Sequence, residues 1–144
     1  MRAQLTPAAQ TSQQFSWELA AGVGALAEAR KGFEQWLAHQ AVDGEHSQDL
    51  VVVLSELAAN AVAATDGDQD GPIAIRSWRA EDEVVLEVEN PPHDHDVDIV
   101  VPVDGDPLRG CGRGLLIVAA YTDTVEVIPR GQANGFTVRC RKQV

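Results

Sequence analysis

The chain has 144 residues, of which 44% are hydrophobic and 23% charged, a composition typical of a soluble globular domain that buries one core. Its formal net charge of −11 and its pI of about 4.6 argue against binding to nucleic acid or to an anionic membrane, because both need a basic surface. No apolar run approaches the roughly 20 residues of a membrane span, and the first residues lack the apolar core of a signal peptide. The two cysteines form no CxxC motif, so reduced thiols and a cytoplasmic protein are expected.

Acidic side chains are concentrated in the middle of the chain. Residues 66–106 carry thirteen acidic and two basic side chains, whereas residues 107–144 carry two acidic and six basic ones. The stretch from Glu81 through Asp106 contains ten carboxylates and no lysine or arginine. Two interpretations remain open: a solubilising surface, or a region that tolerates anions only at its basic end.

The first half of the chain predicts one strand followed by two helices. Residues 1–12 are rich in Gln, Ala and Thr, which is typical of a disordered terminus, so a single domain is expected over residues 13–144. The segment QFSWEL alternates apolar and polar residues as a strand does. A helix is expected over residues 23–41, with Gly44 as its stop signal, and a second helix over residues 46–64. The residues that recur at helical spacing are Leu26, Arg30, Phe33 and Leu37 in the first helix and Leu50, Val53, Leu54, Leu57 and Ala61 in the second.

The second half predicts four strands and one helix. Residues 73–78 and 84–89 alternate around the turn AEDE and predict an antiparallel pair, and residues 124–128 and 136–141 predict a second pair. Between them, residues 91–110 contain four prolines and predict a long loop, followed by a glycine-rich turn that opens into a helix. The order β-α-α-β-β-α-β-β predicts an α+β fold: a two-layer sandwich of a mixed, mostly antiparallel sheet with helices on one face.

Two polar side chains in the second helix suggest a ligand site. Glu56 and Asn60 lie one turn apart and continue a line that begins at Asp49, beside the apolar stripe. Asparagine is an unfavourable helix-interior residue, and small alanines surround it here. A carboxylate and an amide oxygen at this spacing suit a hydrated Mg²⁺ and an oriented water, although a helix flank that meets solvent explains the same pattern.

The glycine-rich turn is a candidate anion site. Gly110, Gly112 and Gly114 let backbone amides approach an anion, the following helix adds its positive N-terminus, and Arg113 adds a charge. The turn is neither a Walker loop nor a dinucleotide fingerprint, because the required lysine and glycine spacings are absent. A plain turn into a helix remains the alternative.

Two further features allow a binding interpretation and a simpler one. Asn90 ends the predicted strand before Pro91-Pro92, where its amide suits a base edge, although Asn-Pro also commonly ends a strand. His93 and His95, among three aspartates, offer transition-metal ligands, although a solvated loop lacks the rigid framework of a metal site.

Taken in sequence order, these motifs resemble the GHKL (Bergerat-fold) ATPase superfamily, and in particular the small anti-sigma-factor serine kinases and their actinobacterial single-domain relatives. LSELAANAV, residues 54–62, is similar to the N box of that family, and GRGLLIVAAYTDTVEV, residues 112–127, is similar to its second glycine box with the following helix and strand. The likeness extends over residues 15–142, nearly the whole chain.

The resemblance implies a role for each candidate residue. Asn60 would ligate the Mg²⁺ that bridges the nucleotide phosphates, Glu56 would be the acid that activates a hydroxyl or water, and residues 91–110 would be the ATP lid. Asn90 would accept a hydrogen bond from the adenine amino group. In the family, an aspartate followed by glycines usually holds that position, so Asn90-Pro91-Pro92 is a departure. The residues that would border the phosphates are Arg109, Gly110, Gly112, Arg113, Gly114 and Leu115.

The resemblance also implies an activity and partners. The chain would bind ATP or ADP with Mg²⁺, sequester a sigma factor and phosphorylate a serine or threonine of an antagonist protein. One alternative is a weak or inactive module that holds partners without transferring phosphate, and another is a metal-binding protein that uses His93 and His95. Apolar residues on the first helix leave a homodimer or partner surface open, because sequence does not separate core from interface.

Overall fold

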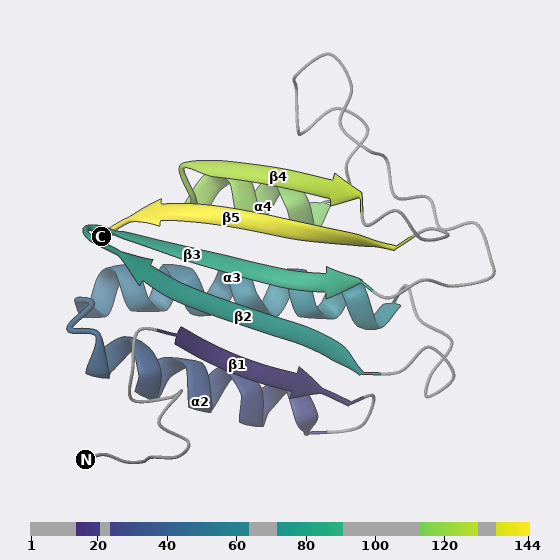
Figure 1. Cartoon of the computed structure of the whole chain (residues 1–144), viewed down its shortest axis with the longest axis horizontal. Coiled ribbons are helices and arrows are strands. Elements are labelled where there is room, and N and C mark those ends of the chain that lie inside the picture. The colour runs from purple at the N-terminus through teal and green to yellow at the C-terminus, as the bar shows by residue number, and fades with distance from the viewer. Residues whose placement is uncertain (1–13, 21–23, 64–71, 91–112, 130–134) are drawn as a thin grey trace.

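The computed structural model describes residues 14–20, 24–63, 72–90, 113–129 and 135–144. They form five strands and three helices in the predicted order (Figure 1). The elements are β1 (Gln14–Leu19), α2 (Ala25–His39), α3 (Gly44–Ala63), β2 (Ile73–Ala80), β3 (Glu83–Asn90), α4 (Arg113–Tyr121), β4 (Thr124–Pro129) and β5 (Phe136–Gln143). The predicted disordered terminus and ATP lid lie outside the described residues.

The strands form one sheet in the order β1-β2-β3-β5-β4, and every pairing in this described sheet is antiparallel. All three helices lie against one face of the sheet (Figure 1). The predicted α+β class with helices on one face is therefore confirmed, but the expectation of a mixed sheet is wrong. The β3–β5 pairing joins strands separated by α4 and β4, and sequence periodicity carries no information about such a pairing or its direction.

The connection between α2 and α3 differs from the sequence prediction at Gly44. The α2 helix ends at His39, and Gly44 is the first residue of α3 rather than a stop signal. Ala41 takes the left-handed conformation (φ 59°), and the Val42 N–H donates to the Leu37 carbonyl, which closes the last turn of α2. The Asp43 carboxylate then accepts from the His46 N–H at 2.9 Å and caps α3.

The core lies between the sheet and the helices. The second predicted helical stripe is confirmed, because all five of its residues are buried. In α2 the buried stripe is Ala29, Phe33, Trp36 and Leu37, and Arg30 of the predicted stripe is exposed. Phe15 of β1 contacts Phe33 and Trp36 with ring centroids 5.3 and 6.0 Å apart, so an aromatic cluster fixes α2 on the sheet.

Helix α3 lies in the middle of the helical layer and contacts β2, β3, α2 and α4. No helix within the described ranges is long and apolar enough to cross a membrane. The face of the sheet opposite the helices carries no further layer among the described elements (Figure 1).

Candidate functional site

The ends of three secondary-structure elements meet at one edge of the domain, which is called the converging edge. The C-terminal half of α3, the end of β3 and the start of α4 lie on the same side (Figure 1). The opposite edge is held by Lys142 of β5, whose Nζ lies 3.4 Å from the Asp49 carboxylate near the start of α3 and donates to the Tyr121 carbonyl at the end of α4 at 2.9 Å. Because this contact joins the first turns of α3 to the last turn of α4, the two helices run in opposite directions. The last turns of α3 therefore lie toward the first turn of α4.

Glu56 and Asn60 lie on the half of α3 nearer this converging edge. Leu57, Ala58 and Ala61 are buried on the core side of the same turns, which fixes the rotation of the helix. As a result, Glu56 is half-buried and Asn60 is exposed. Among the described residues, neither side chain makes a hydrogen bond or an ion pair, so both oxygen groups are available to a ligand.

Asp49 shares their line on the helix but not their environment. Its ion pair with Lys142 ties α3 to β5 at the opposite edge. Of the three polar residues on this line of α3, Asp49 is therefore engaged in an ion pair. Glu56 and Asn60 have no such partner among the described residues.

Asn90 is the last residue of β3 and is only 4% exposed. Its Nδ2 donates to the Val88 carbonyl at 3.4 Å, so the side-chain amide is oriented from within its own strand. The Oδ1 atom is left as a hydrogen-bond acceptor. Such an acceptor suits the amino group of a ligand that reaches the end of β3.

The α4 helix contributes its backbone to the same edge. It begins at Arg113 and buries Val118 in the core, and Thr122 Oγ1 donates to the Val118 carbonyl at 2.8 Å beyond its last turn. The first N–H groups of a helix lack intrahelical acceptors and carry partial positive charge, which favours a phosphate. Gly114 and Leu115 lie in this first turn, so the structure places the helical part of the predicted glycine box here.

Several predicted residues lie outside the described part of the chain. They are Arg109, Gly110 and Gly112 of the glycine-rich turn and His93 and His95 of the proposed metal ligands. Within the described residues, no group of three His, Cys, Asp or Glu side chains is arranged to hold a metal ion.

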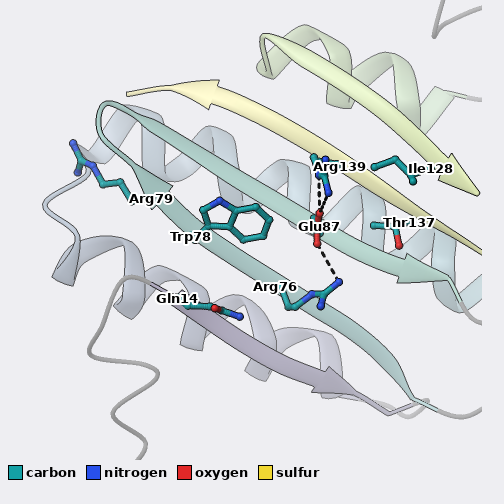
Figure 2. Close-up of a pocket in the computed structure, with 8 residues that line it drawn as sticks. All are labelled: Gln14, Arg76, Trp78, Arg79, Glu87, Ile128, Thr137 and Arg139. Atoms are coloured by element: carbon teal, nitrogen blue, oxygen red, sulfur yellow. Dashed lines mark hydrogen bonds and ion pairs between the residues drawn. The ribbon is translucent and has the colours of Figure 1, made fainter. Parts of the chain in front are cut away.

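Sequence analysis missed a cluster on the open face of the sheet. Arg76 of β2 and Arg139 of β5 both form ion pairs with Glu87 of β3, and Trp78 lies beside them (Figure 2). Alternation places each of them on the face away from the core, but it does not say which strands are neighbours. The register of β3 against β5 is what brings Glu87 to Arg139.

The converging edge therefore offers an acidic and an amide oxygen from one helix, an oriented acceptor at a strand end and the N-terminus of a second helix. Residues 19–142 match the histidine kinase-like ATPase domain, and the chain belongs to that family.

Two solved structures share the fold. The RsbU and RsbW domains of Rv1364c from Mycobacterium tuberculosis superpose with a TM-score of 0.69 at 19% identity, with 92% of this chain and 32% of that chain covered. The chain thus spans about a third of the length of that solved chain. The SiaB–SiaC complex from Pseudomonas aeruginosa gives a TM-score of 0.65 at 16% identity, with 90% and 88% covered. A search of curated proteins found no match.

Proposed function

We propose that this chain binds ATP and ADP with Mg²⁺ at the edge where α3, β3 and α4 converge. The observation that carries the proposal is the position of Glu56 and Asn60 on the half of α3 nearer the first turn of α4. An unengaged amide oxygen, a carboxylate one turn away and a helix N-terminus form a donor set suited to a metal–polyphosphate. Membership of the histidine kinase-like ATPase family supports the same ligand.

Each residue has a distinct role in this proposal. Asn60 provides an oxygen ligand for Mg²⁺, which when bound offsets the negative charge of the phosphates. The α4 N-terminus, with Arg113 and the glycines before it, receives the phosphate oxygens. Asn90 Oδ1 accepts from the adenine amino group, and its hydrogen bond to Val88 holds it in that orientation. Arg109, Gly110 and Gly112 extend the phosphate site.

We further propose that the chain is a cytoplasmic regulator of transcription that acts as a protein serine/threonine kinase on an antagonist protein and sequesters a sigma factor. In the transfer step, a serine or threonine oxygen of the antagonist bonds to the γ-phosphorus of ATP as the bond to the β-phosphate oxygen breaks. ADP leaves, and the hydroxyl proton passes to the Glu56 carboxylate. The resemblance of LSELAANAV to the N box supports this assignment, as does the fold shared with an RsbW domain.

A nucleotide-binding module that holds protein partners without transferring phosphate is the second candidate. It is favoured by Asn90-Pro91-Pro92, where relatives usually have an aspartate followed by glycines. Proline fixes φ where glycine is flexible, and asparagine lacks the charge of aspartate. We therefore expect both replacements to weaken the binding of adenine.

Calorimetric titration with ADP and ATP, with and without Mg²⁺, tests the nucleotide site. The wild-type chain should bind ATP more tightly with Mg²⁺, and Asn60→Ala should lower that affinity by about tenfold or more, a loss of about 1.4 kcal/mol. Gln48→Ala, at an exposed position near the start of α3, is the matched control and should bind as the wild type does. The proposal fails if the wild type binds neither nucleotide or if both variants bind equally well.

A further inference from the structure

Phe136, the first residue of β5, lies directly opposite Asn90, the last residue of β3. Because β5 begins at the edge where β3 ends, both residues lie at the converging edge (Figure 1). Opposed residues of an antiparallel pair project from the same face of the sheet, with Cβ atoms about 4.5–5.5 Å apart. The ring of Phe136 is therefore a neighbour of the Asn90 amide, to which the nucleotide proposal assigns the adenine amino group.

Both side chains lie on the helical side of the sheet. The next pair in the same row, Val88 and Val138, is buried in the core. Because strand residues two apart share a face, Asn90 and Phe136 extend this row to the end of the sheet. Phe136 also packs against the core cluster. Its ring thus lies on the side of the sheet that carries α3 and α4, the two helices of the candidate site.

The row on β5 is less enclosed toward the converging edge. Cys140 and Val138 are 1% and 6% exposed, whereas Phe136 is half-buried. The core therefore holds one part of the ring and leaves another part accessible to a ligand. Asn90 is held as well, because its Nδ2 donates to the Val88 carbonyl at 3.4 Å. The ring and the amide are thus positioned relative to each other before a ligand arrives.

Among the aromatic residues that the structure describes, Phe136 is the only one at the converging edge. Four others pack together between β1 and α2: Phe15, Trp17, Phe33 and Trp36. Trp78 lines the open face of the sheet, and Tyr121 lies at the opposite edge, where its carbonyl accepts from Lys142. Aromatic side chains stack on nucleobases of any sequence, because every base has a π-face. Phe136 is therefore the aromatic ring placed to contact a base at this edge.

We propose that Phe136 stacks on the adenine base whose amino group donates to Asn90, an inference that rests on the nucleotide site proposed above. The two residues recognise different surfaces of the base: Asn90 contacts its edge and Phe136 its face. Asn90 lacks the charge of the aspartate that is usual at its position, and stacking on Phe136 supplies base affinity that does not depend on charge. Neither contact involves the phosphates.

Nuclear Overhauser effects between the full chain and ADP, in the presence of Mg²⁺, test the contact directly. The chain has three phenylalanines, so their ring signals can be assigned by substitution. The ring protons of Phe136 should show effects to the C2 or C8 proton of adenine, and those of Phe15 and Phe33 should show none. Bound ADP without an effect to Phe136 would overturn the inference and leave the nucleotide site standing. Absence of ADP binding by the wild type would overturn both.

Calorimetric titration with three ligands tests the energetic role of the ring. Phe136→Leu should lower the affinity for ADP about fivefold to tenfold. The affinity for inosine diphosphate should fall by the same factor, because hypoxanthine has the same two-ring face with a carbonyl in place of the amino group. Binding of Mg²⁺–tripolyphosphate, which has no base, should not change. Phe136→Tyr keeps the ring and should bind ADP as the wild type does.

Phe33→Leu is the matched control, because it removes the same ring from the core between β1 and α2 and should leave ADP affinity unchanged. Equal ADP affinity in Phe136→Leu and the wild type would overturn the inference. A parallel loss of tripolyphosphate binding would also overturn it, since Phe136 would then support the fold of the whole site. A loss for ADP alone, with inosine diphosphate unaffected, would mean that Phe136 acts by orienting Asn90 rather than by contacting the base.

Discussion

The carboxylate of Glu87 on β3 lies 2.6 Å from the guanidinium of Arg139, its register partner on β5. Removing one member of a buried ion pair costs about 3–5 kcal/mol, and the partial exposure of both arginines reduces that figure here. We expect Glu87→Gln to lower the free energy of unfolding by about 2 kcal/mol in urea denaturation. Glu126→Gln, which alters an exposed pair 3.8 Å from Arg141, should cost less than about 0.5 kcal/mol. Equal losses in the two variants would contradict a structural role for burial at Glu87.

Gly32 of α2 packs directly against the indole of Trp17 on β1. A Cβ atom at Gly32 would lie 2.6 Å from Trp17 Cζ3, so the ring must move to admit a methyl group. Overpacking costs about 1–3 kcal/mol and exceeds the gain of about 1 kcal/mol from replacing a helical glycine. Gly32→Ala should therefore lower the thermal midpoint. Gly44→Ala is the matched control: it meets nothing within 4 Å and should raise the midpoint. A rise in both variants would show that Trp17 does not restrict Gly32.

The Asp43 cap of α3 gives a prediction for acid pH. Two hydrogen bonds to the Asp43 carboxylate lower its pKa below the ordinary value of 3.8. The larger effect comes from the His46 backbone N–H and the smaller one from the His46 ring nitrogen. Because the pKa of Asp43 is lower in the folded chain than in the unfolded chain, ionised Asp43 stabilises the fold fully above pH 3.8. This stabilisation is lost as the pH falls through the folded pKa. Chemical denaturation should show Asp43→Ala less stable than wild type at neutral pH, with the difference decreasing in that acid range. A difference that stays constant well below 3.8 would contradict the assignment.

The elements that were predictable from sequence are those whose pattern is local. Alternation located all five strands, and the stripe that includes Leu50 and Leu57 located α3 with its buried face. The same helical spacing put Glu56 and Asn60 on one flank, where the structure leaves them half-buried and exposed. Gly44 was misassigned because the turn is made by two other residues: Ala41 has a positive φ, and Asp43 provides the capping carboxylate. Neither residue type signals a helix end in the sequence as strongly as glycine does.

The features that sequence did not predict depend on contacts between distant segments. The cluster at Glu87 requires β3 to lie between β2 and β5 in one particular register. Likewise, the ion pair that ties α3 to β5 joins Asp49 to Lys142, near the far end of the chain. The periodicity of apolar residues in the sequence does not report the order of strands in a sheet or the ion pairs between distant segments.

Asp49 therefore provides an internal control for the catalytic role proposed for Glu56. Both are carboxylates on the same line of α3, but Asp49 pairs with Lys142 at one edge and Glu56 lies nearer the converging edge. Glu56→Gln should keep ATP affinity within about twofold, because Asn60 and the α4 N-terminus are unchanged. It should lower phosphate transfer to an antagonist by about 100-fold or more, since the proton acceptor is removed. Labelled-phosphate transfer under single-turnover conditions measures this step separately from nucleotide binding. Asp49→Asn should transfer phosphate at the wild-type rate, and comparable losses in the two variants would mean that Glu56 acts through the helix rather than on the acceptor hydroxyl.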